Sequence, residues 1–277
     1  MNIPGLHFLY LLVVIFLMLP ASLACTEPPK RIISLAPNLT EILYAAGLGE
    51  KVVGVTAFCD KPEEAKKNPK VGGMSNPSLE SIVSLNPDIV VLTTDGNLRE
   101  FEERLRSLMI RTYVFKARRI SELPGGIRDM GSALGEKEKA NYLAREIEAG
   151  IRKFSVSLQH PVKKKVLFII WPEPLIVAGP GTAIDEAITL LGHENIASHS
   201  VVSYPKYSIE AVIRQSPDVI FIGKGHIQIK EMSGGLLKKI ASVPAVKNKK
   251  IFFLGDDLYR MGPGIVKGIG EMSACLN

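Results

Sequence analysis

Histidines and glycine-rich turns are the features of this sequence that could support metal or phosphate chemistry, but none has the spacing that such chemistry needs. His193 and Glu194 begin like the zinc motif H-E-x-x-H, yet the second histidine is absent. The loop at Gly179 begins like the dinucleotide-binding motif G-x-G-x-x-G but ends on Ile184. Neither G-x-x-x-x-G-K-S/T nor G-x-S-x-G occurs. We therefore expect no direct coordination of a metal ion, and we interpret the loop as a strand-to-helix turn.

Two stretches repeat one pattern, with charged residues at matching places. SLESIVSLNPDIVV, residues 78–91, and SIEAVIRQSPDVIF, residues 208–221, share Ser, Glu, Pro and Asp at identical spacing. The serine before apolar residues at helical spacing predicts an N-cap, and the proline ends the helix within three turns. A buried strand follows each Pro-Asp pair. Glu80 and Glu210 are therefore expected in the first turn of a short helix in each half of the chain.

The repeat extends beyond these stretches. Residues 31–35 and 165–170 are short apolar runs typical of buried parallel strands. A helical pattern follows each run, and in both a glutamate lies six residues before a terminal glycine. These matches predict an α/β protein with two related parallel-sheet lobes, residues 31–134 and 161–277.

The segment between the lobes, residues 135–160, predicts one long helix. Apolar residues recur at helical spacing from Glu136 to Gln159, with charged residues elsewhere. At 1.5 Å per residue this helix would be about 35 Å long. A rigid helix between two lobes leaves a cleft, where ligands commonly bind. The apolar stripe consists of Ala140, Leu143, Ala144, Ile147, Ile151, Phe154 and Leu158.

The first 24 residues predict a signal peptide. They contain no Asp, Glu, Lys or Arg, and the apolar run from Phe8 to Leu19 is shorter than the roughly 20 residues of a membrane span. Residues 22–24 fit an A-x-A-like cleavage site. Cys25 follows as in a bacterial lipobox, although Ser22 stands where leucine is usual. We expect export to the periplasm or the outer face of the cytoplasmic membrane, either freely soluble or anchored by a lipid on Cys25.

Composition excludes several other classes. The chain has 277 residues, 46% hydrophobic, which suits a globular protein with one large or two modest cores. Its net charge of +6 comes from short basic clusters interrupted by acids, so no nucleic-acid partner is expected. After Cys25 only Cys59 and Cys275 remain. Two cysteines cannot staple a body of this size, and we expect free thiols.

Several runs together resemble the helical-backbone substrate-binding proteins of ABC importers, and most closely their cobalamin-binding and other metal-chelate-binding members. The resemblance implies two lobes joined by one long helix with little hinge closure, and a monomer without a cofactor. It also implies a ligand bound unchanged in the cleft and delivered to a permease dimer with its ATPase. The runs are RIISLAPNLTEILYAAGLGEKVVGVTAFCDKP, VGGMSNPSLESIVSLNPDIVVL, PLIVAGPGTAIDEAITLLGHENI, YPKYSIEAVIRQSPDVIFIG and GDDLYRMGPGIV.

The resemblance also implies ligand-binding residues. By motif position Phe58, Tyr204, Asp256 and Arg260 correspond to cleft-facing residues of cobalamin binders. Aromatic faces can cover a large macrocycle, and an Asp and an Arg can hydrogen-bond its amide side chains. Trp171, the only tryptophan, follows the carboxyl end of a predicted strand, where ligands of open α/β sheets collect.

The identity of the chelate stays open. The tryptophans that the best-known cobalamin binder places around its ligand are absent at residues 72–74 and 93–97. A corrinoid is the expected ligand. The alternatives are a ferric siderophore, or haem with a histidine or tyrosine as axial ligand. An exported α/β hydrolase is the alternative from a different class.

Glu80 and Glu210 occupy the motif positions of glutamates that, in the similar proteins, pair with arginines of the permease. The resemblance therefore implies one docking carboxylate on each lobe. The simpler explanation is that each carboxylate complements its helix dipole, which contributes about 0.3–1 kcal/mol. Both effects can hold together.

Overall fold

The computed structural model describes residues 27–94, 96–156, 162–224 and 229–276. The predicted signal peptide, Cys25 and the end of the predicted long helix lie outside these ranges.

The first lobe contains a fully parallel sheet in the order β2-β1-β3-β4. Its strands are β1 (Ile32–Ser34), β2 (Val52–Val55), β3 (Ile89–Thr93) and β4 (Thr112–Phe115).

The second sheet is mixed, which corrects the prediction of a fully parallel one. Its main order is β6-β5-β8-β9, and β7 also pairs with β5. β6 is antiparallel to β5 because only Glu173 and Pro174 separate the two strands, and such a short connection can only reverse the chain. The strands are β5 (Lys165–Pro172), β6 (Leu175–Val177), β7 (Glu194–Asn195), β8 (Val219–Gly223) and β9 (Ile251–Leu254).

The two repeated stretches fold as predicted. The side chains of Ser78 and Ser208 cap their helices by accepting hydrogen bonds from the N–H groups of Ser81 and Ala211. The α-helices are α2 (Pro37–Ala45), α3 (Leu79–Ser84), α4 (Arg99–Ser107), α5 (Leu123–Leu134), α6 (Lys137–Val156), α7 (Ala183–Leu190), α8 (Ile209–Gln215), α9 (Ile229–Lys239), α10 (Pro244–Lys247) and α11 (Ile265–Leu276). Short 3-10 turns are η1 (Gly49–Lys51), η2 (Glu63–Lys67), η3 (Ile120–Glu122) and η4 (Asp256–Leu258).

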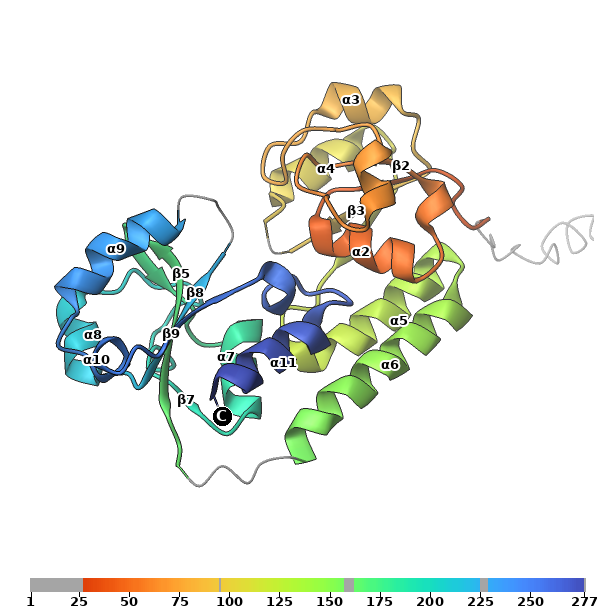
Figure 1. Ribbon diagram of the computed structural model, residues 1–277. Helices are drawn as coiled ribbons and strands as arrows, with labels where there is room; N and C mark the ends of the chain where they lie inside the picture. Colours follow the sequence, from red (N-terminus) through yellow and green to blue (C-terminus); the bar gives the residue numbers. More distant parts are fainter. Residues whose placement is uncertain (1–26, 95, 157–161, 225–228, 277) are drawn as a thin grey trace, which may run out of the picture.

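Two antiparallel helices, α5 and α6, lie side by side between the lobes, and α6 falls within the segment predicted to link them (Figure 1). α6 has 20 residues, and α5 packs along it after the left-handed turn at Gly135. The predicted apolar stripe of α6 faces the interior: Ala140, Ala144 and Ile147 are buried. No helix in the described part of the chain combines the length and the apolar character that a membrane crossing requires.

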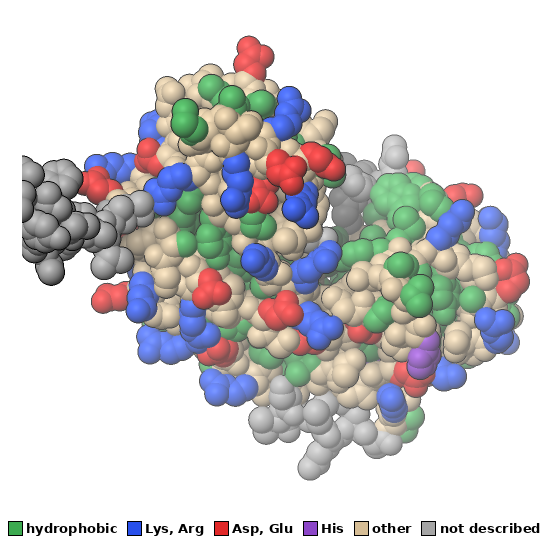
Figure 2. Space-filling view, turned by 180° about the vertical axis from the view of Figure 1, so that it is seen from behind, with side chains coloured by type: hydrophobic (Ala, Val, Ile, Leu, Met, Phe, Trp, Pro, Cys, Tyr) green, Lys and Arg blue, Asp and Glu red, His purple; other side chains and the backbone are tan. Residues whose placement is uncertain are grey.

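One hydrophobic cluster continues from the first lobe into the second. It joins Ile32 of β1 and Phe115 of β4 to Phe168 of β5 through the buried faces of α5, α6 and α11. Separate clusters cover the other face of each sheet. Because a packed interior resists partial separation, the lobes should move little relative to one another. Figure 2 shows the hollow that remains between them on the surface.

Close packing of α5 on α6 can be tested at Gly131. A Cβ atom there would overlap Ala140 of α6, so Gly131→Ala should force the helices apart and lower the free energy of unfolding by about 1–3 kcal/mol. Gly125, on the same helix, has open space around the point where a Cβ would lie, so Gly125→Ala is a matched control that should stabilise by up to about 1 kcal/mol. Urea denaturation measures both. Equal effects would contradict the packing.

The shared core also predicts small motion on ligand binding. Solution X-ray scattering of the mature protein with and without saturating cyanocobalamin should give nearly the same radius of gyration. A large compaction would mean that the lobes close like a hinge despite the continuous core.

Candidate ligand site between the lobes

Arg260 connects the two lobes through carboxylates. Its Nη1 lies 3.0 Å from Glu41 Oε1 and 2.7 Å from Asp60 Oδ1, both in the first lobe. Its Nε lies 2.6 Å from Asp256 Oδ2, one helical turn earlier in the second lobe. The side chains of Arg260 and Glu41 are only 18% and 9% exposed, so this pair is screened little by water.

Lys61 makes a second connection, in which the cation belongs to the first lobe and the acids to the second. Its Nζ lies 3.0 Å from Asp256 Oδ1 and 2.7 Å from Asp257 Oδ1. Asp257 is also paired with Lys267, at 2.6 Å. Each lobe therefore contributes a cation that binds acids of the other lobe. We call Glu41, Asp60, Lys61, Asp256, Asp257 and Arg260 the interlobe network.

The pairing keeps the cations of the network charged. Burial alone would lower the pKa of Arg260, but hydrogen bonds to Asp60 and Glu41 outweigh it and raise the pKa. Burial would likewise lower the pKa of Lys61, and hydrogen bonds to Asp257 and its neighbour raise it instead. Burial raises the pKa of Glu41, and Arg260 offsets this only in part. A ligand in this region therefore meets a fixed positive guanidinium.

The network lies where the strands of both sheets end. Glu41 is on α2, after β1; Asp60 and Lys61 follow β2; Asp256 and Arg260 follow β9. Loops at the carboxyl ends of parallel strands form the ligand crevice of open α/β sheets. The topology thus brings together residues that are some 200 positions apart in the sequence.

Phe58 lies in the same loop as Asp60 and Lys61 of the interlobe network. It lies two residues before Asp60 and is 55% exposed, an unusual state for so large an apolar side chain. Tyr204 and Trp171 form a second group, in the other lobe. Trp171 pairs with Ile176 of β6, which is bridged to Lys206, two residues after Tyr204. Tyr204 is 44% exposed, whereas Trp171 is half-buried and its Nε1 donates to the carbonyl of Glu173.

The structure changes the interpretation of Asp256 and Arg260. We expected both to hydrogen-bond the ligand, but they pair with one another and with the first lobe. Nη2 of Arg260 takes no part in these three pairs, so the guanidinium retains donors for a ligand. Glu41, Asp60 and Lys61 were not among the predicted site residues, although the motif TAFCDKP contains the last two.

The other residues considered in the sequence analysis lie outside the interlobe network. Glu80 and Glu210 are exposed in the first turns of α3 and α8. Cys59 is buried, with its sulfur 3.1 Å from two threonine hydroxyls, and both Cys59 and Cys275 are free thiols. His193 is buried, and its Nδ1 accepts from a backbone N–H.

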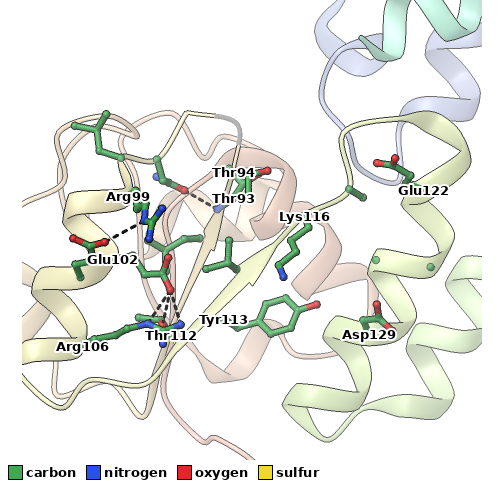
Figure 3. Close-up of a pocket in the computed structure, with 18 residues that line it drawn as sticks. Thr93, Thr94, Arg99, Glu102, Arg106, Thr112, Tyr113, Lys116, Glu122 and Asp129 are labelled. Carbon is green, nitrogen blue, oxygen red and sulfur yellow. Dashed lines mark hydrogen bonds and ion pairs between the residues drawn. The ribbon is translucent and has the colours of Figure 1, made fainter. Parts of the chain in front are cut away.

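A separate groove lies along the outer edge of β4 (Figure 3). This groove has a volume of about 1410 Å³ between α4 and α5, and none of the predicted ligand-binding residues lines it. Its charges on α4 already pair within the helix, Arg99 with Glu103 and Arg106 with Glu102. Burial, together with Asp129, raises the pKa of Tyr113 to about 12, so this phenol stays neutral. The groove is an open sheet edge whose α4 charges are paired within the helix, and none of the predicted ligand-binding residues lines it, so we do not place the ligand there.

Comparison with known proteins gives the family. The model of the periplasmic binding protein family matches residues 32–258. The chain is 33% identical over 206 residues to the vitamin B12-binding protein of Pectobacterium carotovorum subsp. carotovorum, covering 73% of this chain and 75% of that protein.

Two solved structures have the same fold. The periplasmic vitamin B12 binding protein BtuF of Vibrio cholerae has a TM-score of 0.78 and 27% identity, covering 90% of this chain and 97% of that one. The periplasmic heme-binding protein RhuT from Roseiflexus sp. RS-1, in apo form, has a TM-score of 0.82 and 29% identity, covering 89% and 97%. The family match, the relative and the two-lobed fold agree: this chain belongs to the periplasmic binding protein family.

Proposed function

We propose that this protein captures a cobalamin-like corrinoid between its lobes and delivers it to the permease of an ABC importer. The observation that carries the proposal is the pair of exposed aromatic side chains, Phe58 and Tyr204, one on each lobe. Exposed aromatic faces suit a ligand with a large apolar ring system. The name of the Pectobacterium relative, a vitamin B12-binding protein, supports the corrinoid.

The interlobe network provides the polar part of the proposed site. A corrinoid has amide side chains, which accept hydrogen bonds from a guanidinium and donate to carboxylates. Arg260 and Asp256 are held in place by their neighbours before any ligand arrives, so little side-chain entropy is lost on binding. Phe58, Tyr204 and Trp171 would then contact the ring, with Arg260 and Asp256 at its periphery.

We infer that the ligand is bound without chemical change. The proposed contacts are stacking surfaces and hydrogen-bonding groups, and they include no nucleophile paired with a base. No feature of the described residues favours the exported hydrolase. We also infer export by way of the predicted signal peptide, with Cys25 as the residue that would carry a lipid anchor.

Haem is a second candidate because the structure of a heme-binding protein resembles this one at the higher TM-score. Haem needs an axial ligand to its iron, usually His, Cys, Met or Tyr. Tyr204 is the exposed candidate near the proposed site. A ferric siderophore already supplies the ligands of its iron, so it would not need an axial tyrosine.

Fluorescence of the single tryptophan tests the ligand class. Cyanocobalamin should quench Trp171 saturably, because a corrinoid absorbs broadly and would lie near the second lobe's aromatic group. The mature protein is titrated in parallel with cyanocobalamin, hemin and ferric siderophores. Saturable quenching by hemin or a siderophore alone would refute the corrinoid.

Tyr204→Phe is the matched variant for this titration. It retains the aromatic face and removes the hydroxyl, so the affinity for cyanocobalamin should change by less than about tenfold, the equivalent of 1.4 kcal/mol. An iron–tyrosinate bond would be lost completely, and with it the tyrosinate-to-iron charge-transfer band of bound hemin. Recovery of an altered corrinoid after stoichiometric incubation would contradict binding without change.

Charge reversal tests docking by Glu80 and Glu210. Both carboxylates are exposed, so Glu80→Lys and Glu210→Lys should change stability by no more than about 1 kcal/mol. Like charges brought together at an interface cost several kcal/mol. The double variant should therefore bind corrinoid normally but fail to support uptake or stimulate the importer's ATPase, with intermediate losses for each single change. Normal uptake by the double variant would show that the glutamates only complement helix dipoles.

A further inference from the structure

The two repeated helices share an exposed aliphatic residue as well as a glutamate. Val83 of α3 and Ile213 of α8 occupy the same position of the repeat, and they are 44% and 39% exposed. The residues just before them, Ile82 and Val212, are fully buried. Each helix therefore buries one aliphatic residue and leaves the next on the surface, in both lobes.

Other matched polar residues of the repeat have contacts inside the protein. Ser78 and Ser208 cap their helices. Asp88 Oδ2 accepts from the N–H groups at the start of β1, and Asp218 Oδ2 accepts from the N–H of Lys165 at the start of β5. These residues are explained by folding alone.

The glutamates and the exposed aliphatic residues are different. Within the described part of the chain, the carboxylates of Glu80 and Glu210 form no hydrogen bond or ion pair. Val83 and Ile213 leave large parts of their side chains in water. The helix dipole accounts for each glutamate, but it does not account for an aliphatic side chain left partly in water beside the glutamate in both lobes.

The exposed pairs share one geometry. Residues three apart in a helix lie on the same face, so Val83 is beside Glu80 and Ile213 is beside Glu210. α3 and α8 lie at the outer ends of their lobes, away from α5 and α6 (Figure 1). The molecule thus presents two equivalent patches, each a carboxylate next to a branched aliphatic side chain.

We propose that Val83 and Ile213 form the apolar centres of the two permease contacts, each beside its docking glutamate. The proposal rests on the function proposed above and specifies the partner's surface: twice, a basic side chain next to an apolar recess. Two equivalent patches match a partner with two equivalent subunits. An aliphatic contact also excludes water from the neighbouring ion pair, which strengthens it.

Threonine substitutions test the proposal. Val83→Thr replaces a methyl group by a hydroxyl, and Ile213→Thr replaces an ethyl group by a hydroxyl. Both keep a branched side chain at an exposed position, so the variants should fold normally. Binding is measured with the permease–ATPase complex purified from cells in which the chain supports corrinoid uptake. Each change should weaken docking about tenfold and the pair about a hundredfold, with unchanged melting temperature and cyanocobalamin affinity. Val162→Thr is the matched control, because Val162 is 67% exposed and lies between α6 and β5, so docking should be unaffected.

Salt dependence separates the apolar contact from the ionic one. The loss in Glu80→Gln should shrink as salt screens the charge, whereas the loss in Val83→Thr should persist. Wild-type docking by the double threonine variant, with docking lost in the double glutamate reversal, would overturn this inference and leave the proposed function intact. Normal docking by both double variants would refute permease docking through these helices. If the wild-type protein is a dimer and the threonine variants are monomers, the patches bind a second copy of the chain. That result would overturn the inference.

Discussion

The ion pairs of Arg260 are the interaction on which the arrangement of the two lobes depends. The side chain of Arg260 is only 18% exposed, so its charge requires acidic partners, and two of its three partners belong to the other lobe. Lys61 repeats this requirement from the opposite side. Separating the lobes would break both pairs of Lys61 and two of the three pairs of Arg260, and it would also expose the shared hydrophobic core. The same constraint fixes the loops that carry Phe58, Asp256 and Arg260.

The duplicated fold reinforces this connection. Glu41 and Glu186 are equivalent in the repeat, each six residues before a terminal glycine. Glu41 pairs with Arg260, whereas the carboxylate of Glu186 accepts hydrogen bonds from the N–H groups of Ile120 and Ser121 at 2.6 and 3.2 Å. One residue therefore secures the first lobe to the second, and its counterpart secures the second lobe to the segment that leaves the first. The matched residues Glu41 and Glu186 hold the lobes together, and the matched surface residues Glu80 and Glu210 are available to a partner.

Local patterns in the sequence predicted the elements but not their contacts. The caps at Ser78 and Ser208, the buried strands and the apolar stripe of α6 depend on residues within one or two turns, so periodicity was sufficient to find them. The antiparallel β6 was missed because a three-residue strand has no measurable alternation. The partners of Arg260 were missed because Glu41 and Asp60 are about 200 residues away, and only the tertiary fold brings them close. The ligand-binding roles and the docking roles stay predictions.

A crystal structure with bound cyanocobalamin would show whether the ligand lies between the lobes. We expect the corrinoid between Phe58 and Tyr204, with Arg260 still paired with Glu41 and Asp60 and the lobes in unchanged relative positions. A corrinoid bound instead in the groove beside β4, or lobes rotated so that the pairs of Arg260 are broken, would contradict this expectation.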